Sequence, residues 1–170
     1  MKQLRRFLQT SLICCPVIAL CSLMLAEPGS AQTVIPADRE ALLKGLGMGM
    51  ASYADENGYP GPMHVLELKD ELGLTNDQLK KTEALVKVIN SSAVVKGEEI
   101  VQAEEELNKL FVVGTVSEKV LRVKLEEVGK LRADLRFIHL QAHLRMKQIL
   151  TAEQMKRYSE LRGHESKPQD

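Results

Sequence analysis

The sequence contains no tryptophan, its aromatic content is only 4%, and its formal net charge at pH 7 is zero. Proteins that bind nucleic acid or an anionic membrane surface by charge carry a basic excess. Sites that stack bases need aromatic rings. The balanced charge and the shortage of rings therefore argue against a nucleic-acid partner, a polybasic membrane anchor and a stacking site.

The first 31 residues have the layout of a cleavable signal peptide. A basic start is followed by an apolar run over residues 7–25 and by the small-residue exit Gly29-Ser30-Ala31. Cleavage is expected after Ala31, so we predict a periplasmic protein with no membrane attachment once residues 1–31 are removed. The alternative is an uncleaved anchor, which is less favoured because Pro16 interrupts the apolar run.

Cysteine is confined to this leader, since the three cysteines of the chain are Cys14, Cys15 and Cys21. The chain that remains after cleavage thus offers no disulfide framework, no thiolate metal ligand and no cysteine nucleophile. It also lacks a glycine-rich phosphate-binding loop and a serine in a nucleophile-elbow context. We therefore expect that the protein is not an enzyme and that its fold depends on helix packing.

Glycine, proline and small residues are concentrated in residues 32–62, which we interpret as a flexible N-terminal arm or a lip on the core. A short helix over about residues 37–45 is the one regular element expected there. From Met63 the pattern is helical as far as Gly163, and residues 164–170 are expected to form a disordered tail. The chain is therefore predicted to have one helical domain, residues 63–163.

Four helices are expected in this domain, over residues 63–72, 76–111, 116–149 and 152–162. The two long helices carry a seven-residue apolar repeat, and Val112-Val113-Gly114 leaves only a short turn between them. They are predicted to form a long antiparallel hairpin with coiled-coil-like contact. The result would be an all-α fold in which short helices flank the hairpin. The main repeat positions are Leu79, Val86, Ala93, Ile100 and Leu107, followed by Leu121, Val128, Leu135, Ala142 and Ile149.

The end of the second long helix is apolar on several sides, at Phe137, Ile138, Leu140 and Leu144. A single helix contact needs only one apolar face, so this end of the helix must contact something further. The short helices and a second subunit are the available partners, and we expect a homodimer.

A Leu-Thr-x-x-Gln motif occurs twice, at Leu74-Thr75-x-x-Gln78 and at Leu150-Thr151-x-x-Gln154. Each threonine is predicted to be an N-cap whose hydroxyl accepts a bond from a backbone N–H, and each glutamine to complete a capping box. The leucine before each cap is expected to pack, as a hydrophobic staple, on the residue at the fourth helical position. The motifs thus predict where two helices begin and indicate no active residue.

With this doubled motif, and with its order of short helix, long hairpin and short helix, the sequence resembles the periplasmic LTxxQ family. That family includes the Spy and CpxP stress proteins and the metal-responsive CnrX and ZraP. The resemblance covers about residues 63–163 and implies an intertwined, cradle-shaped homodimer of helical hairpins. It further implies ATP-independent chaperoning of unfolded periplasmic proteins, regulation of an envelope stress response through a sensor protein, or metal sensing.

Three histidines are candidate metal ligands. His139 and His143 are four residues apart and share a helix face, and His64 lies on the short helix that the hairpin is expected to bring near them. With Glu67 as a fourth ligand and Met146 as a soft one, they would suit zinc or copper(II), and nickel is within the same class. The alternative interpretation is that the histidines are packing residues that hold no metal.

Valines that lie off the main repeat are a candidate client-binding surface. They are Val94, Val95 and Val101, with Val112 and Val113 near the expected turn. An apolar patch of this kind suits the binding of unfolded clients, and a dimer partner that covers it is the alternative. The predicted function is a periplasmic ATP-independent chaperone or envelope-stress adaptor, and the alternative is a heavy-metal sensor or metal-binding protein.

Overall fold

The computed structural model describes residues 38–163, and every regular element in this range is an α-helix. The all-α prediction is thereby confirmed, whereas the predicted signal peptide and C-terminal tail lie outside the described residues. None of the helices in this range has the length and apolarity needed to cross a bilayer. The helices are α1 (Arg39–Leu43), α2 (Ser52–Glu56), α3 (Pro62–Glu67), α4 (Asn76–Val113), α5 (Glu118–Ile149) and α6 (Ala152–Leu161).

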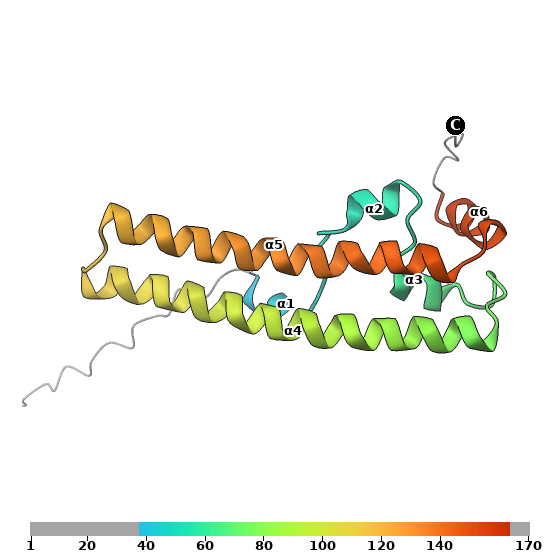
Figure 1. Ribbon diagram of the computed structural model, residues 1–170, viewed down its shortest axis with the longest axis horizontal. Helices are drawn as coiled ribbons and strands as arrows, with labels where there is room; N and C mark the ends of the chain where they lie inside the picture. The colour runs from blue at the N-terminus through green and yellow to red at the C-terminus, as the bar shows by residue number, and fades with distance from the viewer. Residues whose placement is uncertain (1–37, 164–170) are drawn as a thin grey trace, which may run out of the picture. The chain divides into compact units, whose positions relative to one another are not determined.

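The two long helices, α4 and α5, lie side by side and run in opposite directions (Figure 1). Gly114 has a left-handed φ of +71° and ends α4, a conformation that glycine adopts without strain. α4 therefore continues through Val112 and Val113, which were expected in the turn. The Ser117 hydroxyl accepts the amide of Val120 at 3.4 Å and caps α5.

The predicted apolar repeat contributes to the core between these helices. Ala93 of α4 is fully buried and Leu135 of α5 is 1% exposed. Leu85 and Met146 are also buried although they lie off the repeat, because they belong to a cluster that includes residues of α3 and α6. Val101 is buried in a second cluster, which includes α1. The short helices thus cover parts of the hairpin that a two-helix contact would leave exposed.

Residues 38–62, expected as a flexible arm or a lip, lie against the hairpin in the structure. Leu42 of α1 is completely buried, and a Cβ added at Gly97 of α4 would lie 2.1 Å from the Leu42 carbonyl oxygen. Any side chain at position 97 would therefore push α1 away. Two ion pairs also join α1 and the residue before it to the long helices, Asp38–Arg132 at 2.7 Å and Arg39–Glu105 at 3.1 Å.

Candidate functional site

Both Leu-Thr-x-x-Gln motifs form the predicted capping boxes. The Thr75 hydroxyl accepts the amide of Gln78 at 3.2 Å, and the Gln78 side chain accepts the amide of Thr75 at 3.0 Å. Thr151 and Gln154 make the same two bonds at the same distances. Of the residues expected to form the staples, Leu74, Leu150 and Met155 pack in one apolar cluster, whereas Leu79 is not part of it.

The two motifs also contact each other through their glutamines. The Gln78 amide donates to Oε1 of Gln154 at 2.7 Å, and the Gln154 amide donates to Oε1 of Gln78 at 3.1 Å. Each amide also donates to a backbone carbonyl next to the other motif, Gln78 to Ile149 at 2.9 Å and Gln154 to Leu72 at 3.2 Å. We call this arrangement the glutamine junction. It joins the start of α4 to the start of α6, a contact that the sequence did not reveal.

A buried tyrosine on α6 forms the second polar contact between distant segments. The Tyr158 hydroxyl donates to Oδ1 of Asp55 at 2.6 Å and accepts the amide of Gly61 at 3.3 Å. Arg162 donates to the other oxygen of the same carboxylate at 2.7 Å. Tyr158 is completely buried, and its hydroxyl therefore needs these partners. Neither Tyr158 nor Asp55 stands out in the sequence, because they lie 103 residues apart.

Asp55 is expected to make the stability of the protein depend on pH. Burial alone would raise the pKa of this carboxyl, but the hydrogen bonds from Tyr158 and Arg162 and the charge of Arg162 outweigh that effect and lower it. A lowered pKa in the folded state means that the stabilisation is complete above the unfolded pKa, near 4, and is lost as the pH falls through the folded value. Asp55→Asn should lower the free energy of unfolding at pH 7 by about 1 kcal/mol. In urea unfolding, the stability of this variant should also decrease less steeply below pH 4 than that of the unaltered protein.

The matched control for this experiment is Asp70→Asn, which changes an exposed aspartate. It should keep the pH profile of the unaltered protein. An Asp55→Asn profile as steep as that of the control would contradict the role given to Asp55.

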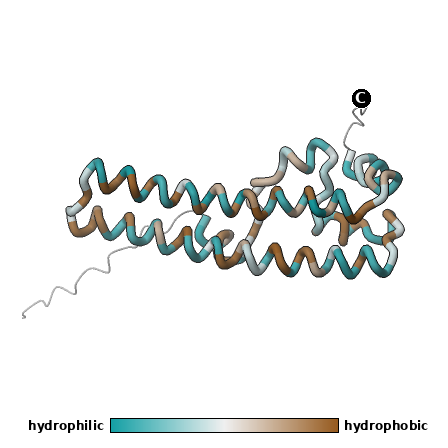
Figure 2. The backbone as a smooth tube through the Cα atoms, viewed as in Figure 1, coloured by the Kyte–Doolittle hydropathy of each residue, from teal (hydrophilic) through white to brown (hydrophobic). Residues whose placement is uncertain are grey.

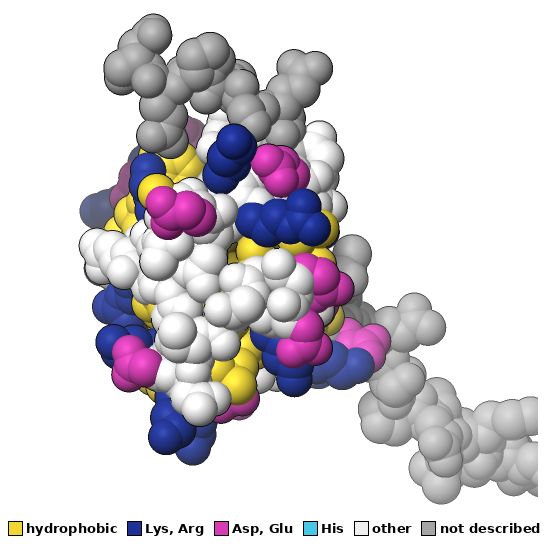
Figure 3. All heavy atoms as spheres, turned by 90° about the vertical axis from the view of Figure 1, so that its right-hand side faces the viewer, with side chains coloured by type: hydrophobic (Ala, Val, Ile, Leu, Met, Phe, Trp, Pro, Cys, Tyr) yellow, Lys and Arg dark blue, Asp and Glu magenta, His cyan; other side chains and the backbone are white. Residues whose placement is uncertain are grey.

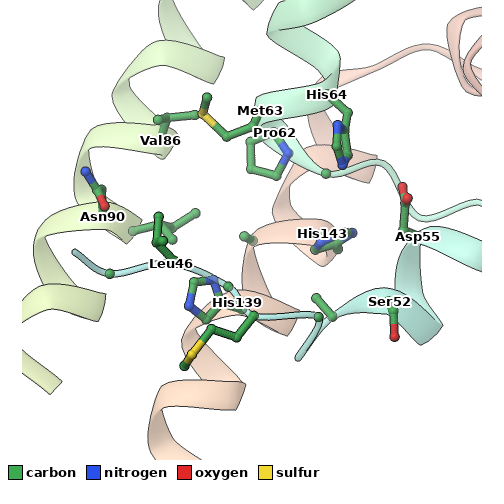
Figure 4. A pocket seen from close by; sticks show the side chains of 18 of the residues that line it. Leu46, Ser52, Asp55, Pro62, Met63, His64, Val86, Asn90, His139 and His143 are labelled. Atoms are coloured by element: carbon green, nitrogen blue, oxygen red, sulfur yellow. The ribbon is translucent and has the colours of Figure 1, made fainter. Parts of the chain in front are cut away.

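The three candidate histidine ligands line one cavity of about 590 Å³, which we call the histidine cavity (Figure 4). Nδ1 of His143 lies 2.8 Å from the Tyr59 carbonyl oxygen and therefore carries the proton in the neutral ring, which leaves Nε2 as an acceptor. Nδ1 of His64 lies 3.0 Å from a carboxylate oxygen of Glu67. Nε2 of His139 is buried without a hydrogen-bond partner, and burial, with a smaller effect of His143, lowers the pKa of His139.

The histidines share the cavity without forming a ready coordination sphere. Within residues 38–163, no three His, Cys, Asp or Glu side chains are grouped closely enough to hold a metal ion. Gly61 lies between two of the rings, since a Cβ added there would be 3.2 Å from atoms of both His64 and His143. Glu67 and Met146 do not line the cavity. Met146 is completely buried in the apolar cluster with Val65 of α3, and this packing keeps it off the wall of the cavity.

The valines of the predicted client-binding surface differ in how far the structure exposes them. Val95 is 54% exposed and Val94 is half-buried, whereas Val101 is only 5% exposed. The prediction for Val101 is therefore wrong in this conformation, because Val101 packs in the cluster that contains Leu42.

A larger exposed apolar surface lies where α4 and α5 meet their turn, and we call it the apolar tip. Figure 2 shows hydrophobic segments at this end of both helices. The opposite end, which faces the viewer in Figure 3, carries interspersed positive and negative side chains. The apolar tip consists of Phe111, Val112, Val113, Val120, Val123 and Leu125, of which Val113 is 70% exposed and the least exposed, Val120, 37%.

No family model, no curated protein and no solved structure matches this chain. The functional proposals that follow therefore rest on the apolar tip, the histidine cavity and the doubled Leu-Thr-x-x-Gln motif.

Proposed function

We propose that the protein is a periplasmic, ATP-independent chaperone or envelope-stress adaptor that binds apolar segments of unfolded client proteins. The observation that carries the proposal is the apolar tip. Soluble proteins seldom expose a contiguous group of large apolar side chains unless it contacts a partner. The tip combines such residues from the end of α4 and the start of α5.

The arrangement of the tip suits a variable client. Phe111, Val112 and Val113 are consecutive in α4, and successive residues of a helix are about 100° apart around its axis. Their side chains therefore face several directions, which favours loose contact with unfolded chain over one fixed interface. Val88 and Val95 of α4 are 53% and 54% exposed and seven residues apart, but the exposed Gln102 and Lys109 follow on the same helix face, so these valines are separate from the tip.

The doubled Leu-Thr-x-x-Gln motif and the order of its helices support this proposal through their resemblance to the LTxxQ family. On the same grounds, the proposed active form is a homodimer, and an envelope sensor protein is a further proposed partner. On α5, Phe137 and Leu144 are 60% and 53% exposed and seven residues apart. They share a helix face and form the surface that we propose for the second copy.

Substituting the apolar tip should abolish client binding. The purified protein is expected to suppress the aggregation of a chemically denatured substrate at an equimolar ratio and without nucleotide, as measured by light scattering. A variant with Phe111→Ser, Val112→Ser and Val113→Ser should lose most of this suppression. The substitutions remove exposed side chains, so the free energy of unfolding should change by less than about 1 kcal/mol.

Tyr53→Ser is the control variant, because Tyr53 is 69% exposed and lies on α2, outside the tip. It should suppress aggregation as well as the unaltered protein does. The chaperone proposal fails if the unaltered protein leaves aggregation unchanged at the equimolar ratio.

A second candidate function is the binding or sensing of a heavy metal, and it is favoured by the histidine cavity. A metal-binding histidine usually donates its other ring N–H to a carbonyl or carboxylate, as His143 does to Tyr59 and as His64 can to Glu67. The orphaned Nε2 of His139 is the third available imidazole nitrogen. Imidazole ligands suit zinc and copper(II), and His64, His139 and His143 would hold such an ion once their side chains moved closer together than they lie in the described residues.

Calorimetric titration with zinc or copper(II) tests this second function. The double variant His139→Ala, His143→Ala should bind the metal at least about tenfold more weakly than the unaltered protein. His164→Ala, which removes a histidine outside the described residues, serves as the control and should leave the affinity unchanged. Equal affinity in the double variant would contradict metal binding at the histidine cavity.

A further inference from the structure

The apolar face of the hairpin beneath α1 is already occupied by a segment of the chain itself. Leu42 forms a buried cluster with Ala93, Ile100 and Val101 of α4 and with Leu135 of α5. Gly97 lies directly beneath the Leu42 carbonyl. We call the surface made by these five residues of α4 and α5 the α1 groove. The absence of a side chain at Gly97 lets the backbone of α1 approach closely, and Ile100, Val101 and Leu135 pack with Leu42.

Charged side chains flank the groove and match those of the segment that fills it. Arg132 of α5 pairs with Asp38 and with Glu104 of α4 at 2.7 and 3.0 Å. Glu105 of α4 pairs with Arg39. The segment in the groove thus presents an acidic residue, a basic residue and, three positions after the basic one, a leucine. This is a recognition pattern of charge and shape together.

The segment that fills the groove has little stability of its own. α1 has five residues and no side-chain cap at its N-terminus, and an isolated helix of this length does not persist in water. The chain that follows contains three residues with positive φ, Gly45, Met48 and Gly49. α1 is therefore held in place by tertiary contacts, those of Leu42, of Leu43 and Met50 beside it, and the two ion pairs, and its release would expose Val101 and the rest of the groove.

We propose that the α1 groove is a second docking surface for client segments that have the chemistry of α1, and that α1 competes with these segments for the groove. The occupant is a short segment with an acidic–basic pair followed by a leucine in the same spacing. α1 itself, seated by charge complementarity and a buried leucine, shows that such a segment fits. This inference rests on the proposed chaperone function in one respect, that the bound segment comes from an unfolded client.

Binding of a labelled peptide with the sequence of residues 37–46 tests the proposal by fluorescence anisotropy. In the unaltered protein α1 occupies the groove, so the apparent affinity is reduced by the fraction of molecules that are open. Leu42→Ala in the protein should free the groove and raise the affinity for the peptide by about tenfold or more. Gly97→Leu should displace α1 but fill the groove, and this variant should bind no better than the unaltered protein. A peptide with alanine in place of the leucine should not bind.

A second opening variant guards against misfolding of Leu42→Ala. The double variant Asp38→Arg, Arg39→Glu places like charges opposite Arg132 and Glu105 and leaves the core residues unchanged. It should also raise the affinity for the peptide. The proposal is overturned if neither opening variant binds more tightly, or if Gly97→Leu gains as much as they do, since α1 would then be a structural cover only. The apolar-tip variant should keep the peptide binding of the unaltered protein, so failure of the chaperone function and failure of the groove are separate results.

Discussion

Replacing both glutamines of the junction, by Gln78→Ala and Gln154→Ala, should lower the free energy of unfolding by about 3 kcal/mol. Each substitution removes half of a capping box and a bond to a backbone carbonyl next to the other motif. Each such bond, and each of the two bonds between the glutamines, is worth about 0.5 kcal/mol because the two side chains are only half-buried, so the six bonds together amount to about 3 kcal/mol. Because the two side chains also bond to each other, each single variant already loses the shared bonds. The double variant should therefore cost less than the sum of the two single variants.

A double-mutant cycle in urea unfolding measures the difference between the cost of the double variant and the sum of the two single costs. The expected coupling between Gln78 and Gln154 is about 1 kcal/mol. Gln102→Ala is the matched control, because it removes an exposed glutamine from the same long helix and should change the stability by less than about 0.5 kcal/mol. Strictly additive costs for the two junction variants would show that the glutamines do not act together.

Gly97→Ala should destabilise the protein, although alanine is the better helix former. Alanine gains about 1 kcal/mol over glycine inside a helix, but its Cβ would lie 2.1 Å from the carbonyl oxygen of Leu42. α1 must then move away, and exposing Leu42 costs about 2–3 kcal/mol. The net loss in free energy of unfolding should be about 1–2 kcal/mol, with faster hydrogen exchange at the amides of residues 42–46.

Gly129→Ala is the control for this substitution and should have the opposite sign. Gly129 is an exposed residue of α5, and a Cβ added there meets nothing within 4 Å. Only the helix propensity changes, so the stability should rise by up to about 1 kcal/mol. A Gly97→Ala variant that gained stability like Gly129→Ala would mean that α1 does not lie on α4 in solution.

The features that the sequence predicts well depend on neighbouring residues. The capping boxes at Thr75 and Thr151 arise from residues three positions apart, and local rules describe them fully. The four-residue spacing of His139 and His143, on one helix, likewise predicts that both face the histidine cavity. The starts of α4 and α6 were predicted correctly for the same reason.

The features that escape prediction depend on which segments meet in three dimensions. The heptad pattern treats α4 as the partner of one helix, so Val101 was assigned to the surface, whereas α1 adds a third contact. Leu42 stands in a glycine-rich segment without periodicity, and nothing in the sequence marks it as a core residue. Met146 follows the histidines by one turn, but the packing of α3 and α6 takes it into the core. The glutamine junction was missed because no local rule brings residues 76 positions apart together.

The same separation along the chain has a consequence for the order of folding. α4 and α5 make contacts across their turn between residues as close in sequence as Glu106 and Lys124, 18 apart, and such contacts close a short loop at low entropic cost. The bonds between Gln78 and Gln154 require the whole hairpin to be in place, so we expect them to form after the rate-limiting step. Interactions that are absent from the transition state slow unfolding and leave the folding rate almost unchanged. The doubled motif would therefore govern how long the folded protein persists, and the hairpin how quickly it forms.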